Sequence, residues 1–187
     1  MRDIIESSSG EYTRYKLIAE GALAQLTDDQ VVAPATGGEN SIATICWHLA
    51  GNLRSRFTDF LTTDGEKPWR RREDEFLPRI VPRAELLRHW ESGWSVLLAE
   101  LAALGDADLV RTVTIRGQAF QVHEALHRSL AHTSYHVGQV VYAARALRGA
   151  AWRFLSIPPG ESEAFNATPY RQRPAEHAAW LRDPSLP

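Results

Sequence analysis

The amino-acid sequence predicts an all-α protein whose long helices pack as an up-down four-helix bundle. Four long segments carry apolar residues at steps of three and four, the period of an amphipathic helix. Connections marked by Gly, Pro and Asp separate these segments, and no internal repeat or low-complexity tract interrupts them. Burying the four apolar stripes against one another is the simplest way for such a chain to form one core.

The first two helices are expected on either side of a loop. The first runs from about Asp3 to Leu26, where Thr27-Asp28-Asp29 begins to break the pattern, and the loop covers residues 32–38. Asn40 or Ser41 can cap the second helix, because either side chain can accept a hydrogen bond from a free amide of the first turn. Its apolar stripe is the clearest in the chain: Ile42, Ile45, Cys46, Leu49, Leu53, Phe57 and Phe60.

The stretch from Thr62 to Pro82 is rich in charge and proline, and it predicts a connection across one end of the bundle. Its run Arg70-Arg71-Arg72-Glu73-Asp74-Glu75 is nearly neutral as a whole, which is typical of a solvated segment. Pro82 is expected to open the third helix, because proline fits the first turn, and this helix should end near Gly105.

A change of pattern precedes the fourth helix. Between Leu109 and Phe120, apolar residues flank Arg116-Gly117 and predict a short hairpin. The fourth helix is expected from about Val122 to Leu147, and an irregular segment follows, of which residues 158–166 either fold back over a functional site or form a plain loop. We therefore expect one domain over residues 1–166 and a polar C-terminal tail over residues 167–187.

Composition excludes several kinds of partner. The 187 residues carry a formal net charge of -2, so the chain lacks the positive excess that neutralises nucleic-acid phosphates. No apolar run approaches the ~18 residues of a membrane-spanning helix, and the first residues lack the order of a signal peptide. Cys46 is the single cysteine, so no internal disulfide can form. We expect a cytoplasmic protein that acts on a small molecule, with neither nucleic acid nor membrane as partner.

Histidines carry most of the chemical information. His132 and His136 are four residues apart, so one helix face holds both with Cβ atoms about 5–6 Å apart, close enough to bind one ion. His123 and His127 have the same spacing, but the helix turns by about 140° between His127 and His132, so one ion cannot use both pairs. His48 on the second helix is a third candidate, although spacing does not show what it faces. Small residues favour the His132 pair: Ala125, Ser129, Gly138 and Ala143.

Other residues near these histidines are weaker candidates. Tyr135 and Gln139 adjoin the ligand pair in sequence, and Asn52 follows His48 by one helical turn, so each either contacts the site or packs elsewhere. Cys46 lies within an apolar stripe and is expected to pack as a small hydrophobic residue, not to act as a nucleophile. Trp90 and Trp94 have the spacing of core residues.

Three segments resemble the DinB-like superfamily of metal-binding four-helix bundles. They are Trp47-His48-Leu49-Ala50-Gly51-Asn52, Leu130-Ala131-His132-Thr133-Ser134-Tyr135-His136-Val137-Gly138-Gln139-Val140, and residues 155–166, which are similar to an end motif of one uncharacterised branch. The resemblance covers about Ile4 to Asn166. It implies that His48, His132 and His136 are the metal ligands and that the bundle forms a homodimer. Related members include thiol-dependent transferases and isomerases.

Three neutral imidazoles suit a divalent ion, with zinc or nickel favoured and iron possible, and they leave a coordination position for water or substrate. The first hypothesis is therefore a metal-dependent transferase that joins a low-molecular-weight thiol to a small electrophile. The second is a metal-dependent hydrolase that uses bound water. The third is a non-catalytic metal-binding or interaction protein. The ligand set alone does not choose among them.

Overall fold

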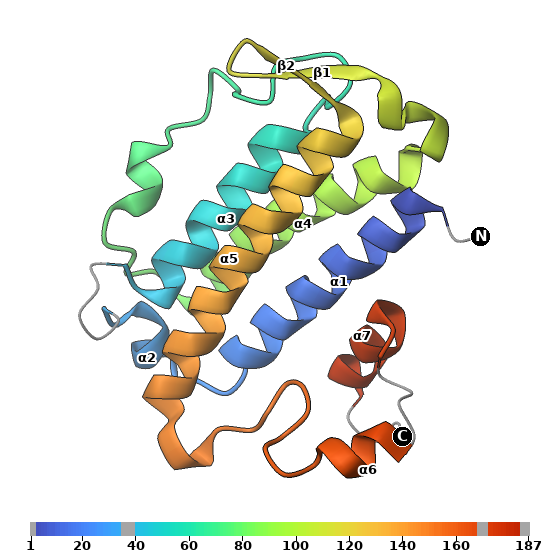
Figure 1. The fold of residues 1–187 in the computed structure, drawn as a ribbon. Helices are drawn as coiled ribbons and strands as arrows, with labels where there is room; N and C mark the ends of the chain where they lie inside the picture. Colours follow the sequence, from blue (N-terminus) through green and yellow to red (C-terminus); the bar gives the residue numbers. More distant parts are fainter. Residues whose placement is uncertain (1–2, 35–39, 168–171, 184–187) are drawn as a thin grey trace.

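Most of the described chain is helical. This computed structural model describes residues 3–34, 40–167 and 172–183, and four long helices dominate them (Figure 1). These helices are α1 (Ile4–Leu23), α3 (Ile42–Phe57), α4 (Arg83–Ala103) and α5 (Val122–Arg148). The shorter helical segments are α2 (Asp28–Val32), α6 (Ser162–Ala167), α7 (Pro174–Arg182), η1 (Glu73–Phe76), η2 (Asp106–Val110) and η3 (Gly149–Ala151). The predicted helical fold class agrees with this content.

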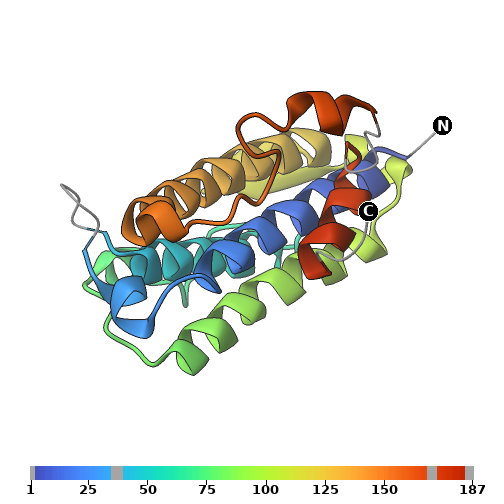
Figure 2. The same ribbon diagram turned by 90° about the horizontal axis from the view of Figure 1, so that it is seen from below.

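The long helices lie side by side, with α3 between α4 and α5 and with α1 against α5 (Figures 1 and 2). Their apolar faces form the core, whose largest fully buried side chains include Trp90, Trp94, Tyr12 and Phe57. The core positions predicted for Trp90 and Trp94 are confirmed. Gly93 lets α4 approach α3 closely, because a Cβ atom there would overlap the backbone of Ala50.

The order of helix directions differs from the predicted up-down alternation. His89 of α4 contacts the carbonyl of Trp47, and Gly93 faces Ala50, so residue numbers rise together along α3 and α4 and the two helices are parallel. The connection between them therefore does not simply cross one end of the helices. It runs back beside α3, where η1 packs against that helix (Figure 1).

Two helix boundaries differ from the predicted ones for local reasons. The first helix ends at Leu23, because Thr27 and Gln30 form a capping box that starts the separate helix α2.

Ser41 caps α3 by accepting a hydrogen bond from the Thr44 amide at 3.1 Å. That helix ends at Phe57, since Asp59 adopts a left-handed conformation with φ 49°. The apolar pattern continued to Phe60 because this residue packs into the core from the following turn. Of the loop predicted over residues 32–38, positions 35–38 lie outside the described residues.

The predicted hairpin is confirmed. Strand β1 (Thr112–Ile115) pairs antiparallel with β2 (Gln118–Gln121), and the turn residues Arg116 and Gly117 have φ values of 55° and 72°. Such a turn matches the twist of the two strands. The Asp64 carboxylate accepts hydrogen bonds from the backbone amides of Arg116 and Gly117 at 2.8 and 2.7 Å. This contact fixes the hairpin against the segment that follows α3.

The C-terminal part contains two short helices. Helix α7, within the stretch expected as a polar tail, packs against α1, and its His177 and Ala178 are buried (Figure 2). No helix in the described ranges combines the length and the apolar character needed to cross a bilayer.

Candidate metal centre

The structure brings together the three histidines that the sequence singled out. His48 comes from α3, and His132 and His136 come from successive turns of α5. One ligand nitrogen from each ring lies within 4.8 Å of the other two. Within residues 3–34, 40–167 and 172–183, no other set of three or more His, Cys, Asp or Glu side chains is arranged to hold an ion.

The spacing of these nitrogens fits a divalent ion. Bonds of 2.0–2.1 Å to a tetrahedral ion place two ligand nitrogens about 3.3 Å apart. The Nε2 atoms of His132 and His136 are 3.1 Å apart, which is already close to that separation. To complete the set, the nitrogen of His48 has to approach by at most about 1.5 Å. The donor set and its geometry therefore fit a metal ion.

Burial keeps the two α5 imidazoles neutral near pH 7. Burial lowers the pKa of His132 to about 3, and the charges of His136, His48, Arg70 and Arg56 act in the same direction. Burial also lowers the pKa of His136 to about 4, against the hydrogen bond to Gln139. A neutral imidazole keeps the lone pair that a metal ligand needs. The site is thus ready to accept an ion without first losing protons from these two rings.

Two of the three rings are oriented by a hydrogen bond from the nitrogen on the far side of the site. His48 Nδ1 donates to Glu75 Oε2 at 2.8 Å, because an ionised carboxylate can only accept. His136 Nδ1 donates to Gln139 Oε1, also at 2.8 Å. These bonds orient both rings with Nε2 toward the site, and in a neutral ring they place the proton on Nδ1, as in known metal sites where outer partners fix the tautomer of a ligand histidine.

Arg70 holds Glu75 in place. Its Nε donates to Glu75 Oε1 at 2.9 Å and its Nη2 donates to Oε2 at 2.8 Å, a bidentate pair. Burial acts to raise the pKa of Glu75, but the hydrogen bonds and charges of Arg70 and His48 outweigh it and hold that pKa below its ordinary value. Glu75 is therefore ionised beneath His48, where it can balance part of the charge of a bound cation.

The interpretation of residues 70–75 as a solvated run was wrong for its first and last members. The side chains of Arg70 and Glu75 are only 2% and 8% exposed, whereas the four residues between them are exposed. The two buried charges pair with each other, so overall neutrality did not reveal their burial. Gly51 was the available signal, because a glycine inside a helix often marks a close approach. A Cβ atom at Gly51 would overlap the carboxylate of Glu75.

Of the other residues that the sequence suggested, some lie near the three histidines and others lie elsewhere. Gln139 contacts His136, as described above, whereas Tyr135 packs its ring near that histidine but is 63% exposed. His123 and His127 lie with ring centroids 6.0 Å apart, and Nδ1 of His123 bonds to the carbonyl of Leu109. Cys46 is buried in the core, where burial raises its thiol pKa to about 12, as expected for a packing residue.

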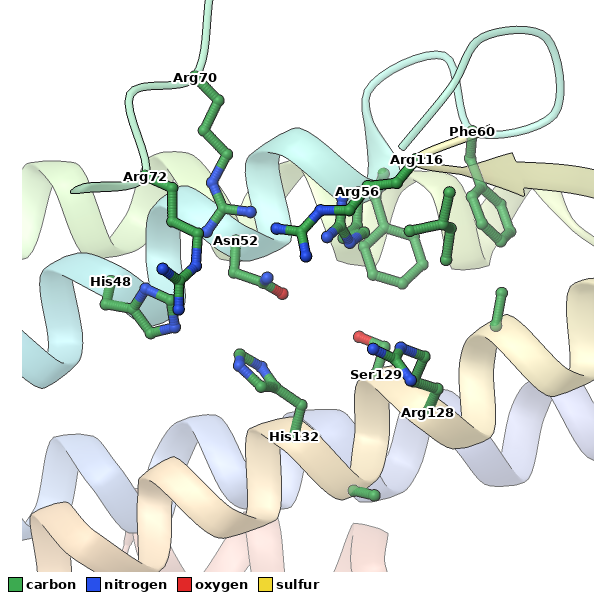
Figure 3. A pocket seen from close by; sticks show the side chains of 14 residues that line it. His48, Asn52, Arg56, Phe60, Arg70, Arg72, Arg116, Arg128, Ser129 and His132 are labelled. Atoms are coloured by element: carbon green, nitrogen blue, oxygen red, sulfur yellow. The ribbon is translucent and has the colours of Figure 1, made fainter. Parts of the chain in front are cut away.

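A cavity of about 440 Å³ opens beside His48 and His132 (Figure 3). Its walls come from α3, from residues 70–72, from the hairpin and from α5, and Asn52 is among them. Residues 158–166 are not among the described residues that line it. Instead, Phe165 lines a smaller cavity with Arg14 and His177. A small molecule in the larger cavity would lie next to an ion held by the histidines.

The fold and the site define a class: a mostly helical protein with a three-histidine candidate metal centre beside a cavity of about 440 Å³. Residues 1–161 match the family described as "Protein of unknown function (DUF1572)", and the chain belongs to that family. The match includes all three histidines, Glu75 and the cavity. No curated protein and no solved structure is matched by the chain.

Proposed function

We propose that this protein binds one divalent metal ion through His48, His132 and His136, within a four-helix bundle of the DinB-like kind. The convergence of the three imidazoles on one point is the observation that carries the proposal. Their burial, the neutrality of the two α5 rings and the hydrogen bonds from Glu75 and Gln139 support it. Zinc or nickel suits this nitrogen set best, and iron also fits. By the resemblance to the DinB-like superfamily, the proposed assembly is a homodimer, and the single cysteine favours a cytoplasmic location.

For the activity, we propose a metal-dependent thiol S-transferase acting on a small electrophile. When bound, the ion would supply Lewis acidity to a coordinating sulfur, which favours the thiolate over the thiol. The sulfur of a low-molecular-weight thiol bonds to the electrophilic carbon, the leaving group departs with its bonding electron pair, and the thiol proton passes to solvent. Three protein ligands and the adjoining cavity support this assignment, because they leave space for both reactants.

In this proposal the chain's own residues hold the ligand rings and the substrate in position and do not transfer protons. Glu75 and Gln139 fix the ligand rings, and the amide of Asn52 lies at the cavity wall. No carboxylate is among the described side chains that line the cavity, so a general base beside the reacting atoms is lacking there. Either nucleophile, a thiol or, in the second candidate, a water molecule, would therefore lose its proton through the ion, and the resemblance to thiol-dependent transferases favours the thiol.

The test has two stages. Elemental analysis of purified protein, before and after chelation and reloading, should find about one divalent ion per chain. The reloaded protein is then assayed with thiols and small electrophiles, and separately with esters and amides. Loss of thiol transfer on chelation and its return with metal would support the proposal. Metal-dependent ester hydrolysis alone would favour the hydrolase, and turnover unchanged without metal would overturn both.

A further inference from the structure

The cavity beside the metal centre has an unusual charge. Its charged lining residues are all arginines, although the whole chain has a formal net charge of -2. They come from α3, from the segment before η1, from the hairpin turn and from α5: Arg56, Arg70, Arg72, Arg116 and Arg128. Neither lysine nor acidic side chains are among the described residues that line it.

The acidic residues that pair with these arginines balance only part of their positive charge. Glu66 Oε2 accepts hydrogen bonds from Arg56 at 3.2 Å and from Arg116 at 2.9 Å, so one carboxylate serves two guanidinium groups. Glu75 is committed to Arg70 and His48. Burial lowers the pKa of Arg56, and the charges of Arg70 and Arg116 add to this effect against that of Glu66. The arginines therefore repel one another across the cavity.

Arg70 and Arg128 both have guanidinium donors that could bind an anion. Arg70 Nη1 is buried and has no hydrogen-bond partner, and Glu66 Oε1, the carboxylate oxygen paired with it, is 4.0 Å away. Leaving a buried charged donor unsatisfied is costly, so a ligand that accepts from it gains affinity. Arg128, one helical turn before His132, makes no hydrogen bond or ion pair within the described part of the chain. Figure 3 shows Arg70 and Arg128 on opposite walls of the cavity, and both residues line it.

Part of the cavity lining is apolar. Phe57, Phe60 and Ile115 line it, and Figure 3 shows Phe60 at the end away from His48, with arginines between the two. A volume of about 440 Å³ lies within the range of small-molecule sites. The occupant that matches this layout has a carboxylate at the arginines and an apolar body beyond it.

We propose that the cavity binds an organic carboxylate with an apolar body, held by Arg70 and Arg128, and that this anion is the electrophilic substrate of the metal site. The claim that this anion is the substrate rests on the proposed function, whereas the claim that the cavity binds an anion does not. Charge-assisted hydrogen bonds from two guanidinium groups to one carboxylate are strong and geometrically selective. They would hold the substrate with its apolar body toward Phe60 and its carboxylate end, which would then also carry the electrophilic carbon, toward His48 and His132.

Calorimetric titration of the protein with 4-phenylbutyrate tests the proposal, with the neutral 4-phenylbutyramide as matched ligand. The carboxylate should bind at least about tenfold more tightly than the amide. Arg128→Gln should weaken carboxylate binding about three- to tenfold, whereas Arg145→Gln, an exposed arginine farther along α5 that stacks over Phe154, should leave it unchanged. Added salt should weaken the carboxylate alone.

Equal binding of the two ligands, an Arg128→Gln affinity equal to that of the unaltered protein, or no binding of 4-phenylbutyrate would overturn the anion site. The titration is run on metal-loaded and on chelated protein, which separates the two proposals. Arginine-dependent binding to a protein that takes up no metal would sustain the anion site and refute the metal centre. Metal uptake without carboxylate binding would sustain the metal centre and refute the anion site.

Discussion

Replacing Glu75 by glutamine should weaken metal binding without altering any of the three ligands. The carboxylate accepts three hydrogen bonds: one from His48 and two from Arg70. The glutamine amide has a single acceptor oxygen, so in either orientation its NH2 group faces a donor, either His48 Nδ1 or Arg70 Nε. The substitution also removes the negative charge that stabilises a cation on His48.

Loss of such an outer partner typically reduces metal affinity about 10- to 100-fold, or about 1.4–2.7 kcal/mol. Competition for zinc against a chromophoric chelator measures this change, with circular dichroism to verify that the variant is folded. Glu73→Gln is the matched control, since Glu73 is 85% exposed and pairs only with Arg72 among the described residues. It should leave the affinity unchanged.

Gly51→Ala provides a second route to the same effect. Its added Cβ would overlap the Glu75 carboxylate and displace it from His48, although the substitution removes no polar group from the chain. We expect an affinity loss in the same range, about 10-fold or more. If a folded Glu75→Gln variant holds zinc as tightly as the unaltered protein, or if Glu73→Gln is equally impaired, the outer-partner role of Glu75 is refuted.

Four further predictions follow from the described contacts. His132→Ala should abolish metal uptake in elemental analysis, whereas His127→Ala should retain it, and equal retention by both would contradict the ligand assignment. Gly93→Ala should lower the free energy of unfolding by about 1–3 kcal/mol, because its Cβ meets the Ala50 backbone, whereas Gly138→Ala, with open space around it, should raise it by up to about 1 kcal/mol in denaturant titrations. Backbone amides of Glu66, Gly117 and Arg116 lower the pKa of Asp64 to about 2, so the stability that its carboxylate contributes is present above about pH 4 and is lost as the pH falls toward 2. Asp64→Asn should therefore be less stable than the unaltered protein at neutral pH, and the difference in unfolding free energy should shrink as the pH falls from about 4 through 2; a constant difference would contradict this. Cys46, with a pKa of about 12, has a thiolate fraction of about 10⁻⁴ at pH 8 and should react with an aromatic disulfide reagent only after denaturation, so rapid reaction of the native protein would refute its burial.

The features that depend on short-range pattern were predictable from the sequence. Helix periodicity located the four long helices, the Arg116-Gly117 turn located the hairpin, and four-residue spacing joined His132 to His136. Each of these features depends on residues that lie within one or two helical turns of one another in the sequence. The residues that form the pattern also make the contacts that stabilise the feature, so the sequence is sufficient to predict it.

The path of the connection between α3 and α4 was not predictable in this way. Its composition resembles that of any solvated loop, and only the three-dimensional course of residues 58–82 beside α3 puts Glu75 under His48. The parallel arrangement of α3 and α4 follows from the same course. Spacing likewise could not show that His48 faces α5, nor that arginines from four parts of the chain meet in one cavity. These are contacts between distant segments, for which no local pattern exists.

The fit of Gly51 against Glu75 has a consequence for how related chains can diverge. Since the absent side chain at position 51 makes the space that the carboxylate fills, the two positions are not free to change independently. A relative with alanine at position 51 should carry a shorter acid, aspartate, or no acid at position 75, and paired substitutions at these positions should outnumber single ones. Relatives that keep three histidines but lose this pair should hold their metal less firmly, so a histidine motif alone would overstate how many of them are metalloproteins.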